Sequence, residues 1–355
     1  MDIAWAKSAP AVQQSRTTLG LFAGVRFGTL LRFLFTTVVT LAPFSYVAAQ
    51  LDVSEVHVLP RAMPAPSASS EHVLRTHVDL VLVPVTVLDH AGRAVTGLEP
   101  ANFAVLDDKN PQVVRYLSNV DEPISLMVVV DASASMATKI RETRNAVTEL
   151  VNTSNPQDDF GLIVVSDAPR VALHFGDSAS EIQRTVDALQ PEGFTALWDG
   201  MYLGIKELKN SRYQRKAMVV ISDGGDNHSR YTKSELRSLL KEADVEVYAI
   251  GVFDPCIQYI RTCAIRLEEK TGPLQLDEVT SVTGGRVFSA HDSAELSGAV
   301  TQISHELRNQ YVLGYYPNNR CRDGKWRTLK VHLAGSASHA SFRLYAKKGY
   351  YAPTE

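Results

Sequence analysis

The sequence predicts an α/β fold built on a doubly wound sheet with helices on both faces. Two observations support this prediction. Apolar runs of strand length alternate with amphipathic segments between residues 125 and 309, and polar residues directly follow several of the runs. Such alternation implies right-handed βαβ crossovers, which place helices over a parallel sheet. At 355 residues, with 45% hydrophobic and 21% charged residues, the chain also has room for a second, smaller globular unit.

The predicted strands of this sheet are continuous apolar runs, as expected for strands that are buried on both faces. They are ISLMVVVD, FGLIVVSD, KAMVVISD, EVYAIGVFD and the shorter GRVFSA. The predicted helices are IRETRNAVTELVN, SEIQRTVDALQ, ALWDGMYLGIKELK, TKSELRSLLKEADV, LDEVTSVTG and SAELSGAVTQISHELRNQ. Their spacing is helical: in the third, Leu197, Met201, Ile205 and Leu208 form one apolar stripe.

The segments on either side of the α/β region predict strands only. In residues 77–122, VDLVLVPVTVLD is a strand in which Pro84 indicates an edge or a bulge, and NFAVLDDKNPQVVRYL is two short strands around the turn DDKN. Residues 310–355 contain YVLGYYP, WRTLKVHLAG and ASFRLYAKKGYYA. We expect the two flanks to complete one small β unit, with the α/β domain of residues 123–309 inserted between them.

The N-terminus has the features of a targeting segment. Basic residues precede the apolar run FLFTTVVTLAPFSYVAA, which ends in small residues before Gln50. We expect residues 1–49 to be a secretory signal peptide and residues 50–76, rich in Pro, Ala and Ser, to be a flexible linker. An uncleaved membrane anchor is the alternative, because the run approaches spanning length. Both interpretations predict a secreted, periplasmic or envelope-associated protein. Cleavage of the signal peptide would leave no membrane span in the mature chain, whereas an uncleaved anchor would retain one.

Charge and cysteine content narrow the function classes. The formal net charge of -3 and the lack of a long basic block argue against nucleic-acid binding. Outside the cytoplasm, Cys256 and Cys263 could form a disulfide across CIQYIRTC, which would leave Cys321 unpaired; three free thiols are the alternative. No second close Cys or His pair accompanies them, so the spacing does not indicate zinc.

Polar side chains gather where two predicted strands end and where one helix begins. Asp131, Ser133 and Ser135 follow the first apolar run, Thr195 lies in the loop that opens the third helix, and Asp223 follows KAMVVIS. In an open α/β sheet, ligands bind at the carboxyl ends of the strands. Two carboxylates and three hydroxyls are hard oxygen donors, which suit Mg²⁺ best and Mn²⁺ or Ca²⁺ as alternatives. Such an ion would retain the ability to attract a carboxylate from a partner.

These residues carry a resemblance to a known family. The turn DASAS, the distant Thr195 and the later Asp223 resemble the metal-ion-dependent adhesion site of von Willebrand factor type A domains. The resemblance covers about residues 123–309 and implies a Rossmann-like fold, with one divalent cation at the top of the sheet. It also implies adhesion through a partner's acidic residue. The flanks, with VTGLEPANFAVLDDKNPQVVRYL and QYVLGYYP, resemble the bacterial VWFA-related family of acidobacterial type, although the turn DDKN contains less glycine than is usual there.

Each piece also has a purely structural interpretation. The two serines are common turn or cap residues, and Thr195 is a common helix N-cap. Asp226 and Asn227 are typical turn residues, which leaves them as possible contacts behind the metal ligands.

We therefore expect a binding or adhesion protein whose cation captures an Asp or Glu of a protein partner. An envelope assembly factor that recruits another protein is the closest alternative, and a module that has lost its metal is a further one. An enzyme is not expected, because the sequence lacks GxSxG, HExxH and P-loop patterns. A metal-assisted hydrolase would have to use His228 or Asp226 as its base. We place partner specificity in the loop of residues 254–273.

Overall fold

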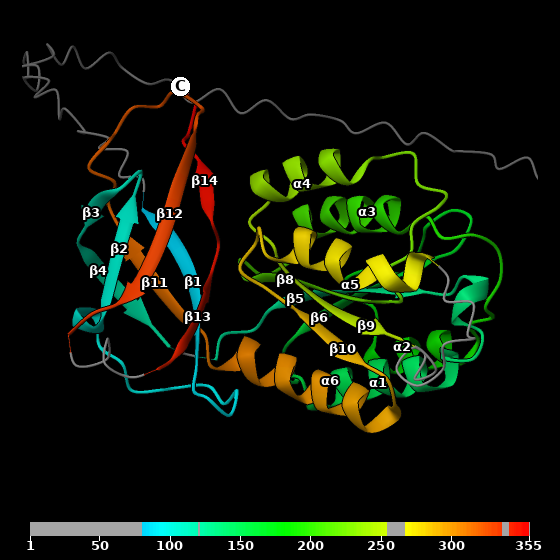
Figure 1. The fold of residues 1–355 in the computed structure, drawn as a ribbon. Coiled ribbons are helices and arrows are strands. Elements are labelled where there is room, and N and C mark those ends of the chain that lie inside the picture. Colours follow the sequence, from blue (N-terminus) through cyan, green and yellow to red (C-terminus); the bar gives the residue numbers. More distant parts are fainter. Residues whose placement is uncertain (1–79, 120, 254–266, 336–340, 355) are drawn as a thin grey trace, which may run out of the picture. The chain divides into compact units, whose positions relative to one another are not determined.

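The computed structural model describes residues 80–119, 121–253, 267–335 and 341–354 (Figure 1). The predicted signal peptide of residues 1–49 and the linker of residues 50–76 lie outside the described residues. Among the described residues, no helix is both long and apolar enough to cross a lipid bilayer.

A six-stranded sheet forms the centre of the α/β domain, in the order β10-β9-β8-β5-β6-β7. Its strands are β5 (Ser125–Asp131), β6 (Asp159–Val165), β7 (Arg170–Leu173), β8 (Lys216–Ser222), β9 (Glu246–Val252) and β10 (Val287–Ala290). All neighbours pair in parallel except β6 and β7, which are antiparallel. The predicted α/β fold is confirmed. The sequence analysis missed β7, an edge strand in which only Leu173 is buried and which therefore lacks an apolar run.

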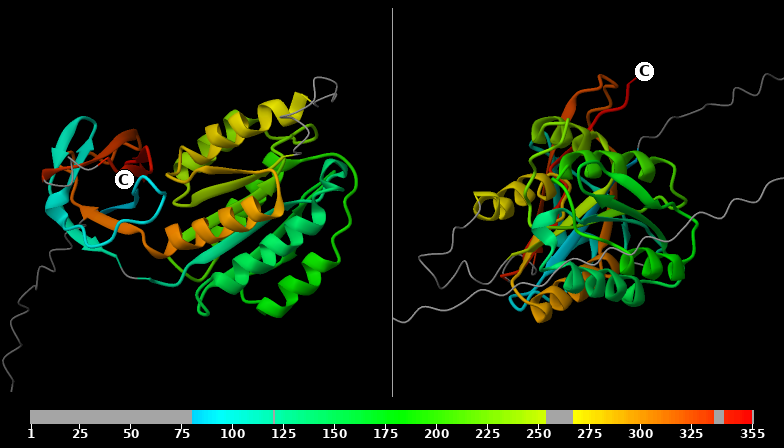
Figure 2. Two further views of the ribbon diagram at one scale, coloured as in Figure 1. Left: turned by 60° about the horizontal axis from the view of Figure 1, so that its bottom comes forward. Right: turned by 90° about the vertical axis from the view of Figure 1, so that its right-hand side faces the viewer.

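Helices cover both faces of this sheet (Figure 1; Figure 2). One face carries α1 (Ile140–Thr153), α2 (Ala179–Asp187) and α6 (Ser293–Arg308), and the other carries α3 (Leu197–Lys209), α4 (Lys233–Glu242) and α5 (Leu267–Thr280). Alternate residues of β5 serve the two cores: Leu126 and Val128 pack with the first set of helices, Met127 and Val129 with the second. Burial on both faces explains why these strands read as unbroken apolar runs.

Helix α5 begins earlier than the sequence analysis predicted. The prediction started at Leu276. Gly272 and Pro273, which precede it, are poor residues for a helix interior. The structure places both inside α5. A side chain at position 272 would lie 2.2 Å from the carbonyl oxygen of Asp223, so the close approach of α5 to the loop after β8 requires glycine there.

The flanking strands form two four-stranded antiparallel sheets, in the orders β13-β1-β11-β4 and β14-β12-β2-β3. Their N-terminal strands are β1 (Val81–Leu88), β2 (Phe103–Asp107), β3 (Asn110–Gln112) and β4 (Val114–Ser118). Their C-terminal strands are β11 (Tyr311–Tyr315), β12 (Trp326–Leu333), β13 (Arg343–Ala346) and β14 (Gly349–Tyr351). Pairing of β1 with β11 and of β2 with β12 joins the two flanks, as predicted.

Local features of this β unit follow from its sequence. Pro84 lies in an interior strand, but β1 pairs with β11 through residues 81–85 and with β13 only from residue 85 onward. The strand is therefore a local edge at Pro84, where a missing N–H is tolerated. In the turn between β2 and β3, Asp108 and Lys109 both have positive φ (46° and 71°), as a two-residue hairpin loop requires.

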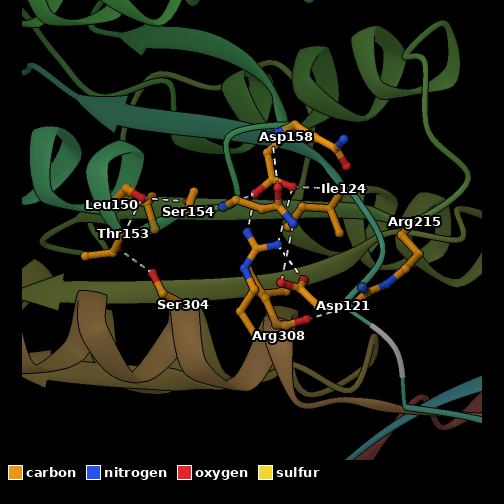
Figure 3. A network of polar contacts seen from close by, with 12 residues as sticks. Asp121, Ile124, Leu150, Thr153, Ser154, Asp158, Arg215, Ser304 and Arg308 are labelled. Carbon is orange, nitrogen blue, oxygen red and sulfur yellow. Dashed lines mark hydrogen bonds and ion pairs between the residues drawn. The ribbon is translucent and has the colours of Figure 1, made fainter.

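The chain passes from the β unit into the α/β domain between β4 and β5, and returns between α6 and β11. A network of charged groups joins these two connections (Figure 3). Arg308, at the end of α6, pairs with the buried carboxylate of Asp158 and donates to Asp121 at 2.8 Å. Asp158 also accepts the backbone N–H of Ile124 at 3.0 Å. Arg215 donates to the carbonyl oxygens of Glu122 (2.9 Å) and Leu307 (2.6 Å). The entry and the exit of the inserted domain are thus bound to each other.

A second buried polar cluster links the α/β sheet to the β unit. Glu246, the first residue of β9, accepts hydrogen bonds from the Gln310 amide (2.8 Å) and the Tyr248 hydroxyl (3.1 Å). Gln310 also lies 3.3 Å from the hydroxyl of Thr86 in β1. Burial raises the pKa of Glu246 to about 7, although the hydrogen bonds from Gln310 and Tyr248 act against the rise.

Removing the Arg308 guanidinium should destabilise the fold strongly. Arg308→Ala leaves the Asp158 carboxylate, which is 0% exposed, without its charged partner, and we expect a loss of about 3–5 kcal/mol in the free energy of unfolding. Urea denaturation measures it. Arg93→Ala, which breaks an exposed ion pair with Asp89, is the matched control and should leave the free energy of unfolding nearly unchanged. Equal losses of unfolding free energy in the two variants would show that the contacts of Arg308 do not stabilise the fold.

Glu246 should make the fold less stable as pH rises. Its folded pKa of about 7 exceeds the ordinary value of 4.5, so between these pH values the folded state retains a proton that the unfolded state releases. Glu246→Gln removes this titration. Relative to the native chain, we expect the variant to gain about 2–3 kcal/mol in free energy of unfolding between pH 4.5 and pH 8. Urea titrations across that range measure the gain, and a constant difference would refute the assignment.

Candidate functional site

Three loops meet at the edge of the sheet where β5 and β8 end. The first, residues 132–136, follows β5 and contains the short 3-10 helix η2 (Ala134–Met136). The second, residues 190–196, leads into α3, and the third, residues 223–231, follows β8. Because β5 and β8 are parallel neighbours, their carboxyl ends lie side by side.

Backbone hydrogen bonds fasten the middle loop to the other two. The Ala134 N–H donates to the carbonyl of Gly193 at 3.1 Å. On the other side, the Thr195 carbonyl accepts the N–H groups of Asn227 (3.0 Å) and His228 (3.1 Å). The Thr195 N–H donates to the side-chain oxygen of Asn227 at 3.0 Å. Thr195 is thus held between the turn that contains Ser133 and the loop that begins at Asp223.

Asp131 is the most buried of the predicted site residues, with 0% exposure. One carboxylate oxygen accepts the Ser133 N–H at 2.9 Å, and the other accepts the Ser222 hydroxyl at 2.6 Å. Burial, together with the nearby charge of Asp223, raises the pKa of Asp131 to about 6, although these hydrogen bonds oppose the rise. The fold therefore holds two neighbouring carboxylates in a place that disfavours negative charge.

Asp223 is also buried, and it faces a cation from this chain. One of its oxygens accepts the Gly225 N–H at 3.1 Å, and the other lies 3.8 Å from the ammonium of Lys139. Lys139 is itself buried at the N-terminus of α1. Its charge offsets part of the negative charge of the two aspartates.

The hydroxyls of the site are not used as helix caps. Ser133 precedes η2 but makes no side-chain cap hydrogen bond, and the N-cap of α3 is Ala196 rather than Thr195. The hydroxyl oxygens of Ser133 and Ser135 lie 3.1 Å apart. Ser133 and Thr195 are buried, while Ser135 is partly exposed and opens the cluster to solvent.

The donor set fits a hard divalent cation. It offers only oxygen, from two carboxylates and three hydroxyls. Burial and the neighbouring charge of Asp223 raise the pKa of Asp131, and a bound cation would oppose that rise. Within the described residues, no three His, Cys, Asp or Glu side chains are grouped to hold a metal ion. A cation here would therefore depend on the hydroxyls as well as on Asp131 and Asp223.

Asp226 and Asn227 lie behind this cluster and hold the loops in place. One oxygen of Asp226 accepts the Leu197 N–H at 2.8 Å and the Ser229 hydroxyl at 2.5 Å, which anchors the start of α3. Burial raises the pKa of Asp226, and its hydrogen bonds oppose the rise. Asn227 orients Thr195 through the bonds described above.

The sequence analysis missed two contributors. Ser222 donates to Asp131, and Lys139 lies beside Asp223. The signals were present but weak: Ser222 is a hydroxyl at the end of an apolar strand, and Lys139 begins a helix on the side of its buried residues.

Two aromatic rings lie at the rim of the cluster. Phe194, directly before Thr195, is 59% exposed and stacks on His228, with ring centroids 5.2 Å apart and planes at 16°. The Phe194 N–H donates to Asp167 at 2.6 Å. Gly193 has a φ of 75°, and a side chain there would collide with the same carboxylate, so the loop conformation needs glycine at that position.

The remaining predicted features lie mostly beyond what the structure describes. Cys256 and Cys263, with residues 254–266 of the loop expected to set specificity, lie outside the described residues. Cys321 is exposed and unpaired.

Comparison with known proteins identifies relatives of the central domain. The family model described as von Willebrand factor type A domain matches residues 125–302. An uncharacterised protein of Borreliella burgdorferi is 21% identical over 196 residues, covering 50% of this chain and 57% of the relative. The human inter-alpha-trypsin inhibitor heavy chain H4 is 20% identical over 230 residues, covering 60% of this chain. The chain spans only 23% of that protein's length.

Among solved structures, a von Willebrand factor type A protein from Catenulispora acidiphila is 13% identical, with a TM-score of 0.44. The match covers 78% of this chain and 74% of that one.

Neutralising Asp131 should stabilise the protein when divalent cations are chelated. Asp131→Asn retains the shape of the side chain and removes one of two neighbouring buried charges. In EDTA at pH 8 we expect the free energy of unfolding to rise by about 1–3 kcal/mol, the size that the pKa shift implies. Asp187→Asn, on the exposed side of α2, should change it by less than about 0.5 kcal/mol. A destabilised Asp131→Asn would show that the carboxylate is needed for the fold itself.

Proposed function

Because the chain belongs to the von Willebrand factor type A domain family, we propose that it is a non-enzymatic binding protein that uses a divalent cation to capture a protein partner. Asp131, Ser133, Ser135, Thr195 and Asp223 hold the ion, for which Mg²⁺ is the best match. The bound ion supplies a positive charge that attracts an Asp or Glu side chain of the partner.

The observation that supports this proposal most directly is the convergence of the three loops. Backbone hydrogen bonds place Thr195 between the Ser133 turn and the Asp223 loop, although the three segments are far apart in the sequence. Two buried carboxylates lie close together there, and positive charge from Lys139 or from a bound ion stabilises their ionised forms. Neutral hydroxyls complete the donor set, so a divalent ion would be balanced by only two carboxylates and would remain attractive to a third.

The alternative of a metal-assisted hydrolase has less support. It needs a general base free to accept a proton beside the ion. Asp226 is engaged with the start of α3 and with Ser229, and the His228 ring is stacked on Phe194. Asp226 therefore holds the loops together, and within the described residues the contacts of His228 give it no partner that would make it a general base.

The basic and apolar N-terminal sequence supports a place outside the cytoplasm, in the envelope or secreted. An envelope assembly factor would use the same capture mechanism on a component of its own complex. The identity of the captured protein separates the two roles.

Titration calorimetry with Mg²⁺ tests the ion site. We expect one site per chain in the native protein and no measurable binding in Asp131→Ala. Thr195→Val, which removes a hydroxyl and preserves the shape, should weaken Mg²⁺ binding by about tenfold or more. Asp187→Asn is the matched control and should bind as the native protein does.

Two outcomes would count against the proposal. If the native protein binds none of Mg²⁺, Mn²⁺ and Ca²⁺, the proposed ion site is wrong. If Thr195→Val binds Mg²⁺ as tightly as the native protein does, Thr195 is not a ligand of the ion. Circular dichroism of each variant establishes whether a loss of Mg²⁺ binding is due to unfolding.

A further inference from the structure

Phe194 and His228 form an aromatic platform beside the candidate ion site. Phe194 belongs to the loop before α3 and His228 to the loop after β8, and their rings stack at 5.2 Å. Phe194 is 59% exposed, so its ring is accessible to a partner. Exposed aromatic residues next to a binding site are typical of interaction surfaces.

The platform is held rigidly at its base. The Phe194 N–H is bonded to Asp167 at 2.6 Å, and the His228 N–H is bonded to the Thr195 carbonyl at 3.1 Å. One face of the Phe194 ring is covered by His228, which restricts its rotamers. A rigid aromatic group loses little conformational entropy when a partner covers it, and it therefore contributes efficiently to binding.

Charge does not explain this surface. The exposed charged residues of the two loops are Glu192 and Arg230, which carry opposite signs, and the exposed Asp167 lies beside the Phe194 backbone. Beyond the partner's carboxylate, the aromatic pair is therefore the principal feature of this surface that a partner can recognise.

The position of the aromatic platform indicates which side chain of the partner can pack on it. Phe194 immediately precedes Thr195, and consecutive Cα atoms are only about 3.8 Å apart. A side chain that directly neighbours the ion-bound carboxylate in the partner's chain is therefore close enough to cover Phe194.

We infer that the partner presents an Asp or Glu adjacent to an aromatic side chain, which packs on the Phe194–His228 platform. This inference rests on the proposed function and adds a specificity-determining residue to it. Phe194 acts through the partner and takes no part in holding the ion.

Fluorescence anisotropy with labelled hexapeptides tests the inference on the full chain in saturating Mg²⁺. The probes are Gly-Gly-Asp-Phe-Gly-Gly, the same peptide with Gly for Phe, and the same peptide with Asn for Asp. We expect the Asp-Phe peptide to bind roughly threefold to tenfold more tightly than Asp-Gly, as an aromatic contact provides. In Phe194→Ala that preference should disappear while the Mg²⁺ affinity stays within about twofold of the native value.

Two further variants serve as controls. Phe194→Trp should retain the preference, because it keeps a stacking ring. Val113→Ala alters a 63% exposed apolar residue of the β unit and should change nothing.

The outcomes distinguish the inference from the proposed function. A native protein that binds both Asp peptides equally, or a Phe194→Ala variant that keeps the preference, overturns the inference and leaves the ion mechanism intact. A Phe194→Ala variant that loses Mg²⁺ affinity to the same extent also overturns it, because Phe194 would then shape the ion site. Equal binding of the Asn peptide, or no Mg²⁺ binding at all, overturns the proposed function and the inference together.

Discussion

The parallel pairing of β5 with β8 is the constraint on which the candidate site depends. Val130 is in register with Ile221, so the next residues, Asp131 and Ser222, reach the edge of the sheet at the same level. Their hydrogen bond of 2.6 Å fixes the carboxylate, and Asp223 follows one residue later. Two acidic residues that are 92 positions apart by their numbers are thereby forced into one buried neighbourhood. The ammonium of Lys139 and the hydrogen bonds from Ser222 and Ser133 offset part of that enforced proximity of like charges.

Much of this arrangement follows from the sequence, because burial on both faces leaves a plain apolar signature. The central strands, the helices between them and the pairing of the two flanks could be predicted in that way. The five oxygen donors could be proposed because each one lies at a strand end or a helix start. Features that depend on neighbours distant in the sequence could not be predicted. The edge strand β7 has little burial to mark it, and the start of α5 conflicts with Gly272 and Pro273. The role of Ser222 depends on register, and the stacking of Phe194 on His228 depends on two loops meeting.

Close packing of backbone on backbone explains one of these differences, the early start of α5. Gly272 lies against the carbonyl of Asp223, and a side chain at Gly224 would lie 2.6 Å from the Cα of Gly272. Here the contact with a distant loop outweighs the low helix propensity of glycine and proline. The same contact connects α5 directly to the loop that carries Asp223. The position of that helix and the position of the aspartate are therefore not independent.

The insertion of the α/β domain between β4 and β11 also affects how the chain is made. On the ribosome, β1 to β4 emerge first, but their principal partners β11 and β12 emerge only after the whole inserted domain has been synthesised. Until then, strands such as β1 present unpaired N–H and C=O groups together with an apolar face, a state prone to aggregation. The contacts that end this exposure are of long range and form slowly. The ion pair between Arg308, which precedes β11, and Asp121, which follows β4, holds the start of the C-terminal strands next to the end of the N-terminal strands. Arg308 also pairs with Asp158.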